Sequence, residues 1–129
     1  MTDLPVSPGL DDALGFTLDE ANGDRVVLSW TVGPQHLQAY GIVHGGVHCA
    51  AVESSASIGA ALWFMERGRV VGVSNHTNFL RSARAGERLV ATATPIHRGR
   101  SQQLWQVAIT DSAERLVARG EVRLQNLSG

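Results

Sequence analysis

Lysine is absent from this sequence, and cysteine is almost absent. All 11 basic residues are arginines, and Cys49 is the only cysteine among 129 residues. Schiff-base chemistry and lysine-anchored pyridoxal phosphate are therefore excluded, because both need a lysine amine. A single thiol also excludes an intrachain disulfide and a CxxC metal or redox site.

Charge is sparse, and no segment has the pattern of a leader or a membrane span. The formal net charge of −1 argues against general affinity for nucleic acid or anionic membranes. The N-terminal MTDLPVSPG lacks the basic start and apolar core of a signal peptide. Residues 26–52 carry no charged side chain, but they include Gly33-Pro34 and three histidines, so they do not read as a membrane span. We therefore expect a cytoplasmic protein.

The length fits one domain over residues 1–129, with residues 1–8 as a loose lead-in. Alternating apolar residues predict strands over residues 16–20, 26–32, 71–79, 89–96, 104–110 and 116–125. The one long helical segment is His44–Glu66, and Leu10 to Leu14 could form a short helix. Because short turns join the strands, neighbours should be antiparallel. The predicted fold is α+β, a curved antiparallel sheet wrapped round one central helix.

The long helix lacks an ordinary solvated face. Residues placed at 100° steps form one apolar stripe, made of Val47, Ala50, Ala51, Ser54, Ile58, Ala61, Leu62 and Met65. The back of the helix carries the small residues Cys49, Ala56 and Ala60, with Glu53 and Ser57 toward one edge. We expect both sides of this helix to be covered.

Glu53 is the only charged residue between Val26 and Met65. A carboxylate in such an apolar segment is costly to bury and adds nothing to packing. One interpretation is an exposed helix glutamate, or one paired with an arginine from elsewhere. The other is an acid, base or nucleophile held in an apolar cleft.

The helix begins with the segment Gly41-Ile42-Val43-His44-Gly45-Gly46. Free amides at a helix N-terminus favour an oxyanion, although a plain loop-to-helix junction would also use glycine. Glu53 follows His44 by nine residues, roughly 13 Å along a helix. A carbonyl at the helix start is thus out of reach of the same chain's Glu53, which predicts an active site shared between two subunits.

Other constellations are weaker. His44 and His48 have the i, i+4 spacing of a helical metal pair, but no HExxH motif accompanies them. Cys49 is better explained as a small buried residue than as a nucleophile. The turn His97-Arg98-Gly99-Arg100 could hold phosphates or could carry solvated arginines.

Two segments together resemble a known family. These are Gln38-Ala39-Tyr40-Gly41-Ile42-Val43-His44-Gly45-Gly46 with Glu53 and Ser57, and Asn75-His76-Thr77-Asn78-Phe79-Leu80-Arg81 with Gly86 and Arg98-Gly99-Arg100. They resemble the hotdog-fold acyl-CoA thioesterases over about residues 10–125. The similarity is greatest to the phenylacetic-acid-degradation branch, which includes the Arthrobacter-type 4-hydroxybenzoyl-CoA thioesterase.

The resemblance implies a role for each matching residue. Glu53 matches the catalytic carboxylate, as nucleophile or as general base, and Gly45 the amide that polarises the thioester carbonyl. Gln38 matches a glutamine beside that carbonyl, and His44 supports the motif loop. Ser57 stands where the related enzyme has a threonine that positions water, and it keeps the hydroxyl. The substrate- or CoA-binding positions are Gly46, Asn75, Arg98, Gly99 and Arg100, with the two arginines near the CoA phosphates.

The sequence therefore predicts an acyl-CoA thioesterase that releases a free acid and CoA without a metal or redox cofactor. The resemblance implies a homodimer that pairs again into a homotetramer, and neither nucleic acid nor membrane is an expected partner. Two alternatives stay open: a non-catalytic acyl-CoA binding or sensing module, and a carboxylesterase acting on small non-CoA esters. The acyl group itself is not identified, because Tyr40, Trp63 and Phe64 could line an aromatic or an aliphatic pocket.

Overall fold

The computed structural model describes residues 9–129, and the lead-in predicted for residues 1–8 lies outside them. Its helical elements are α1 (Leu10–Ala13), η1 (Pro34–His36), α2 (Gly45–Phe64) and η2 (Met65–Arg67), where η marks a 3₁₀ turn. Its strands are β1 (Thr17–Ala21), β2 (Val26–Thr31), β3 (Gly68–Phe79), β4 (Arg88–Arg98), β5 (Gln102–Thr110) and β6 (Leu116–Ser128). The order is the predicted one: a hairpin, a long helix and four further strands.

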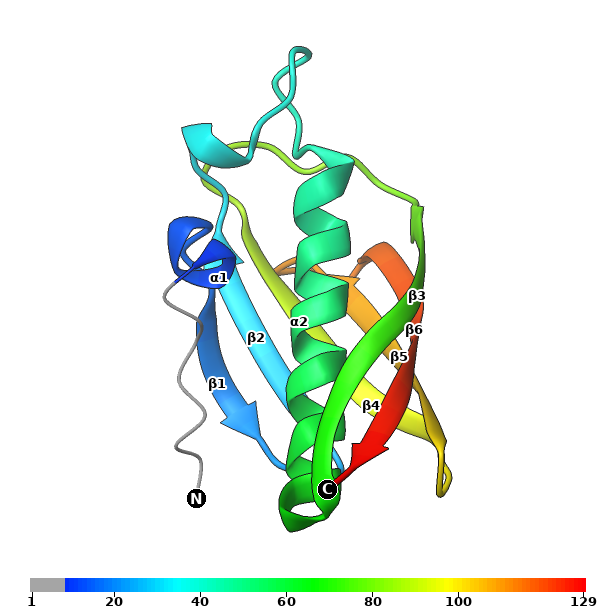
Figure 1. The fold of residues 1–129 in the computed structure, drawn as a ribbon. Coiled ribbons are helices and arrows are strands. Elements are labelled where there is room, and N and C mark those ends of the chain that lie inside the picture. The colour runs from blue at the N-terminus through cyan, green and yellow to red at the C-terminus, as the bar shows by residue number, and fades with distance from the viewer. Residues whose placement is uncertain (1–8) are drawn as a thin grey trace.

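The six strands form one antiparallel sheet in the order β1-β2-β4-β5-β6-β3. The sheet curves round α2, which runs along its concave side, and β3 passes across the front of the helix (Figure 1). This arrangement confirms the predicted α+β architecture. It leaves β1 and β3 as the two edge strands, and β3 is the longer of them.

Local chemistry explains where the long helix begins and ends. His44 is its N-cap, with extended backbone and a side-chain Nδ1 that accepts a hydrogen bond from the Gly46 amide at 2.7 Å. The helix ends where Met65 adopts a positive φ of 43°, which cannot continue a right-handed helix. Gly68 then follows at φ 148° and begins β3.

The buried face of α2 differs from the predicted stripe. The buried positions are Val47, His48, Ala51, Val52, Ser55, Ala56, Gly59, Ala60 and Phe64. Met65, placed in the stripe, is 47% exposed, whereas Ala56 and Ala60, placed on the back, are fully buried. The error has a physical cause: the sheet approaches so closely that small residues face it, and a hydrophobicity pattern does not rank small residues highly. A Cβ on Gly59 would lie 2.5 Å from the ring of Trp105.

A β-bulge in β3 changes which residues face the helix. The sequence alternation places one set on a single face: Val71, Val73, Asn75, Thr77 and Phe79. The pairing of β3 with β6 shifts register between Gly72 and Ser74, so the single alternation is wrong. Because of the extra residue, Gly72 and Asn75 both lie against α2, and Val73 is 54% exposed.

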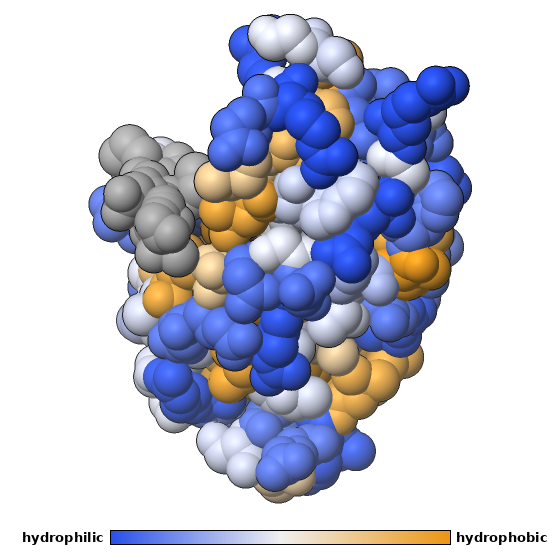
Figure 2. Space-filling view, turned by 90° about the horizontal axis from the view of Figure 1, so that it is seen from below, coloured by the Kyte–Doolittle hydropathy of each residue, from blue (hydrophilic) through white to orange (hydrophobic). Residues whose placement is uncertain are grey.

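One face of the molecule shows its hydrophobic residues in separate areas. Seen from below, it is mostly hydrophilic with several small hydrophobic areas between (Figure 2). In the part of the chain that the structure describes, no helix is both long and apolar enough to span a membrane.

Candidate active site

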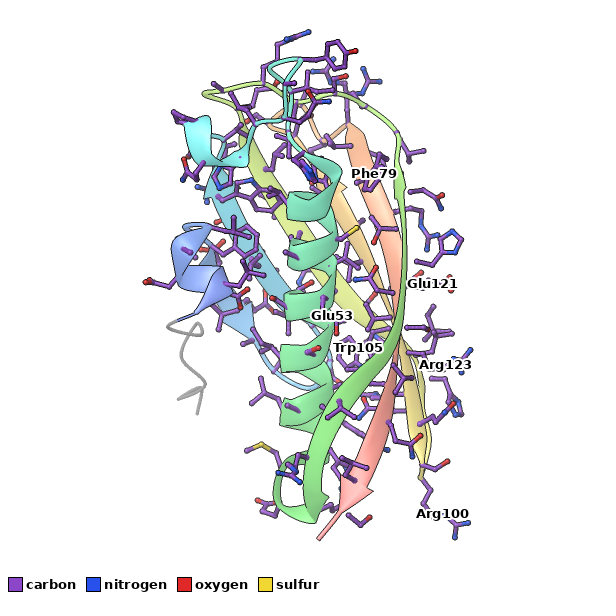
Figure 3. The ribbon with its side chains drawn as sticks, turned by 45° about the horizontal axis from the view of Figure 1, so that its top comes forward. Glu53, Phe79, Arg100, Trp105, Glu121 and Arg123 are labelled. Carbon is purple, nitrogen blue, oxygen red and sulfur yellow. The ribbon has the colours of Figure 1, made fainter. Side chains whose placement is uncertain are left out.

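Glu53 lies in the middle of α2 on the side that faces β3 (Figure 3). Asn75 donates from Nδ2 to Glu53 Oε1 at 3.2 Å, and the Ser57 hydroxyl lies 3.4 Å from Oε2. Asn75 is itself fixed, because Nδ2 also donates to the Cys49 carbonyl at 3.1 Å and Oδ1 accepts from the Thr77 hydroxyl at 2.7 Å. The carboxylate is therefore held by an amide and a hydroxyl from two different elements.

No arginine neutralises this carboxylate within residues 9–129. None of the ion pairs found there includes Glu53, and the side chain is only half-buried. The interpretation of Glu53 as one partner of a structural ion pair therefore finds no support. A half-buried carboxylate with neutral neighbours keeps lone pairs that can accept a proton or attack a carbonyl.

Gly72 makes room for the Glu53 side chain. A Cβ at Gly72 would overlap Oε2 of Glu53, the far end of a flexible side chain. The β-bulge places this glycine, like Asn75, on the helix side of β3. Sequence reasoning missed Gly72, and a glycine inside a predicted strand was the available indication of a bulge or a close approach.

The first turn of α2 offers a free amide at Gly45. The His44 side chain accepts the Gly46 amide, so that amide is already used in the helix cap. Among the described residues no acceptor is found for the Gly45 N–H, and its position at the positive end of a 20-residue helix suits an oxyanion. The Phe79 ring packs against the Cα of Gly45, so that a Cβ at this position would lie 2.7 Å from the ring. The amide predicted to bind the carbonyl is thus available, and the Gly46 amide is not.

A cavity of about 300 Å³ lies beside this amide. Its lining includes Gln38, Ile42, Gly45, His48, Phe79 and Arg81. The structure therefore brings together Gln38 and Gly45, both of which the family resemblance places at the thioester carbonyl. The side-chain Oε1 of Gln38 accepts the Tyr40 amide, which fixes the loop between residues 37 and 43.

Glu53 does not line this cavity. Eight residues separate it from Gly45 along α2, which is about 12 Å at the rise of an α-helix. Within one chain, the carboxylate and the free amide belong to two different places, as the sequence predicts from helix length.

His48 is the residue of this region that sequence reasoning undervalued. Its side chain is 3% exposed, and its Nδ1 has no hydrogen-bond partner among the described residues. Burial lowers the pKa of His48 from 6.5 to about 4, because removal from water disfavours the charged ring. The ring is therefore neutral at pH 7. A histidine on an otherwise apolar helix face is the indication that the sequence offers, in addition to the metal-pair spacing of His44 and His48.

The arginines of the β4–β5 turn lie far from the other candidate residues. Arg100 is at the opposite end of the molecule from Phe79 (Figure 3). Arg98 is engaged within the chain, since Nη1 donates to the Gly23 carbonyl at 2.6 Å and pairs with Asp24 at 2.8 Å. The predicted contact of these arginines with CoA phosphates stays a prediction, with Arg100 the freer of the two.

A second cavity, of about 470 Å³, adjoins this turn, and its lining includes Trp63, Arg67, Arg98, Gly99 and Arg100. Asn126 holds the turn in place by donating to the carbonyls of Gly99 and Arg100. Among residues 9–129 no group of three or more His, Cys, Asp or Glu side chains could hold a metal ion, and His44 and His48 have no third partner.

The family model of the thioesterase superfamily matches residues 40–118. A putative esterase of Mycobacterium tuberculosis is 50% identical over 127 residues, which span 96% of this chain and 90% of the relative. This chain belongs to the thioesterase superfamily. That membership confirms the predicted family, and with the sheet and helix described above it confirms the hotdog fold.

Two further relatives agree with this assignment. The 1,4-dihydroxy-2-naphthoyl-CoA hydrolase of Listeria monocytogenes is 36% identical over 84% of this chain and 88% of its own length. The crystal structure of AziG from S. sahachiroi has a TM-score of 0.93 and 50% identity, covering 97% of this chain and all of the AziG chain. The protein is a thioester hydrolase, as the sequence predicts.

Gly72→Ala should impair this thioesterase without unfolding it. The new methyl group displaces the Glu53 carboxylate, and that side chain is flexible enough to move away. We expect kcat to fall by about tenfold or more, since a carboxylate displaced by about 1 Å is badly placed for chemistry. Steady-state kinetics and thermal melting measure the two effects. The control is the same change in a Glu53→Gln background, where no further loss should follow; an equal loss there would contradict the explanation.

His48 should make the thioesterase sensitive to acid. The pKa of this histidine is lower in the folded chain than in the unfolded one, so the unfolded chain takes up the proton first as the pH falls. Above about pH 6.5 the contribution of His48 to the free energy of unfolding is constant. As the pH drops from there toward 4, the free energy of unfolding falls by up to about 3 kcal/mol. Urea unfolding at pH 7 and pH 4.5, at one protein concentration, measures this loss.

His48→Phe serves as the comparison for that measurement, because phenylalanine cannot take up a proton. The variant should lose less stability between pH 7 and pH 4.5 than the unmodified protein. Asp111, whose pKa is lowered by the backbone amide of Arg115, titrates mainly below this window and is the same in both proteins. Equal losses in the two proteins would show that His48 is not the acid-sensitive group.

Proposed function

We propose that this chain hydrolyses an acyl-CoA thioester to a free acid and CoA, with Glu53 as its catalytic carboxylate. The observation that carries the proposal is the setting of Glu53, oriented by Asn75 and Ser57 with no cation beside it. A neutral setting leaves the carboxylate free to act. Relatives named 1,4-dihydroxy-2-naphthoyl-CoA hydrolase, from Listeria monocytogenes and Escherichia coli, support a CoA thioester as the substrate class.

The proposed reaction divides its tasks between the helix start and the helix middle. The substrate carbonyl oxygen accepts the Gly45 N–H beside Gln38, so the negative charge of the tetrahedral intermediate is stabilised there. Glu53 either removes a proton from water as the water attacks the carbonyl carbon, or attacks that carbon itself. In either case the C–S bond breaks and CoA leaves as a thiolate, which takes up a proton. After attack by water the acid is free, whereas after attack by Glu53 the acyl group stays on Glu53 as an anhydride until water hydrolyses it. Ser57 positions the water, and the proposed route uses no metal or redox cofactor.

The distance between Glu53 and Gly45 supports a site that is completed by a second copy of the chain. About 12 Å of helix separates them, and one thioester carbonyl cannot meet both in the same chain. Strand β3 offers the surface for pairing, because it is a 12-residue edge strand with exposed residues along most of its length. Long exposed edges pair readily with another strand. The proposed unit is a homodimer joined along β3, and the family resemblance extends it to a homotetramer.

A carboxylesterase is the second candidate. The name of the Mycobacterium tuberculosis relative, putative esterase, favours it, and the same carboxylate and amide could hydrolyse an oxygen ester. Comparing kcat/KM for acyl-CoA thioesters with that for p-nitrophenyl esters separates the two. A binding module without catalysis is distinguished by the absence of any turnover.

Glu53→Gln tests the central residue. Glutamine keeps the size and the hydrogen bonds but can neither attack a carbonyl nor accept a proton from water. We expect kcat on the best acyl-CoA to fall by at least ~10²-fold, typical of a lost acid–base group. The melting temperature should hold or rise, because a partly buried charge is removed. Ser57→Ala should cost less, since water can still enter unaided.

The matched control is Glu66→Gln, an exposed glutamate near the end of the same helical segment, which should leave kcat unchanged. Near-full activity of Glu53→Gln would show that this residue is not the catalytic carboxylate. Unfolding of that variant would instead assign the glutamate a structural role.

Subunit complementation tests the shared site. Gly45→Pro removes the proposed oxyanion amide at the first helical position, where proline is tolerated. His44 already has φ −65° and ψ 135°, the conformation preferred before proline. Gly45→Pro and Glu53→Gln should each be nearly inactive. Co-expressed in equal amounts, they should regain roughly a quarter of the native rate, because half of the random dimers are hybrids with one intact site of two.

Gly45→Ala is the matched control, because it brings the same Cβ against Phe79 but keeps the N–H. It should retain most of the activity, whereas removing an oxyanion donor costs about 10²–10³-fold in kcat. If the mixture of Gly45→Pro and Glu53→Gln stays inactive although hybrids form, the site is not shared between subunits.

A further inference from the structure

The cavity beside Gly45 contains one buried polar side chain without a partner. His48 lines the cavity, is 3% exposed, and has no hydrogen-bond partner for Nδ1 among the described residues. Buried polar atoms in folded proteins nearly always have a partner, and an orphan costs about 1–3 kcal/mol. Nδ1 itself is closed off from the cavity, with less than 1 Å² of accessible surface. Nε2 also has no partner among the described residues but is not closed off in this way, so a bound molecule can reach the ring at Nε2.

Aromatic rings flank His48 on two sides. Its ring centroid lies 6.4 Å from Trp30 and 6.0 Å from Phe79, and Trp30 in turn contacts Phe16 at 4.9 Å. The Phe79 ring also packs on Gly45. Trp30 and Phe16 lie in the core behind His48, and of these rings Phe79 and His48 line the cavity itself. Two aromatic rings in a cavity wall favour a flat ligand by offset or edge-to-face contact. The cavity therefore suits a ring with a polar group placed to meet His48.

The position of His48 relates it to the acyl group of the substrate. It lies one helical turn after Gly45, about 4.5 Å along α2. If the thioester carbonyl binds the Gly45 amide, the acyl group that continues from this carbonyl enters the same cavity. This step rests on the proposed function.

We propose that His48 is a specificity-determining residue, which hydrogen-bonds a neutral hydroxyl group on an aromatic acyl substrate. A hydroxyl both donates and accepts, so it can pair with Nε2 whether that nitrogen carries the proton or not. Because the ring is uncharged at pH 7, it offers no counter-charge to a carboxylate on the acyl group. Arg81 is the charged residue of the cavity lining, and it is exposed.

Binding to an inactivated protein tests the proposal apart from turnover. In a Glu53→Gln background, titration calorimetry measures Kd for benzoyl-CoA and for the 2-, 3- and 4-hydroxybenzoyl-CoA isomers. At least one hydroxylated isomer should bind about tenfold more tightly than benzoyl-CoA, the gain expected from one well-placed hydrogen bond. Adding His48→Phe should abolish that preference and leave the Kd of benzoyl-CoA within about threefold, because the ring shape is kept.

Two further variants show whether the preference for a hydroxylated isomer comes from hydrogen bonding, from the shape of the ring or from charge. His48→Gln keeps a donor and an acceptor, so part of the preference should remain. Arg81→Gln changes the charge of the cavity lining and should weaken all four thioesters by a similar factor. Thermal melting of each variant confirms that it is folded, and His48→Phe should melt no lower than its parent, because an unpaired buried nitrogen is removed.

The proposal is overturned if no hydroxylated isomer is preferred, if the preference survives His48→Phe, or if Arg81→Gln rather than His48→Phe abolishes it. Failure of the proposed function has a different signature. In that case the unmodified protein hydrolyses no acyl-CoA from a panel that also includes aliphatic thioesters. The calorimetric comparison still reports on His48, because it measures binding to a protein that does not turn over.

Discussion

The close approach of α2 to the sheet is the constraint on which the rest of this structure depends. A sheet that curves round a single helix leaves little space between backbones. Ala51, Ala56 and Ala60 are fully buried there, and Gly59 lies directly on the ring of Trp105. Side chains of this size let the sheet curve closely round α2. Glu53 lies where β3 crosses the helix, without a charged partner among the described residues. A larger residue at Gly59 would force the helix or Trp105 to move, because interiors are close-packed.

The bulge in β3 couples the candidate site to the edge of the sheet. Without the extra residue, Gly72 and Asn75 would lie on opposite faces of the strand. With it, Gly72 makes room for the Glu53 carboxylate and Asn75 holds it. One edge of β3 pairs with β6 and the other stays open, so the strand that orients the proposed catalytic group is also the strand available to a second copy. A change at this edge should therefore affect both assembly and activity.

Much of the fold could be predicted from sequence, because the four inner strands, β2, β4, β5 and β6, bury one face and largely alternate accordingly. Leu89, Ala91 and Ala93 on β4 are fully buried while their neighbours are not, and such a pattern is readable without coordinates. The faces of α2 could not be predicted in this way. Alanine, serine and glycine occur all round it, and hydrophobicity does not decide which of them meet the sheet. The bulge was hidden for a similar reason, since one extra residue leaves the local composition unchanged.

Some features of the candidate site could likewise be predicted from the sequence, and others could not. Glu53 stands out in the sequence because forty residues around it carry no other charge, and its separation from Gly45 follows from the rise of a helix. The partner of Asp24 does not stand out, because Arg98 lies 74 residues away and meets it only through the folded sheet. His48 shows the limit most clearly. The property that makes it a candidate exists only in three dimensions: a buried ring without a hydrogen-bond partner among the described residues, at a cavity that Gly45 also lines. Local spacing thus identifies groups that act along one helix, whereas unmet hydrogen-bonding capacity has to be counted in the folded chain.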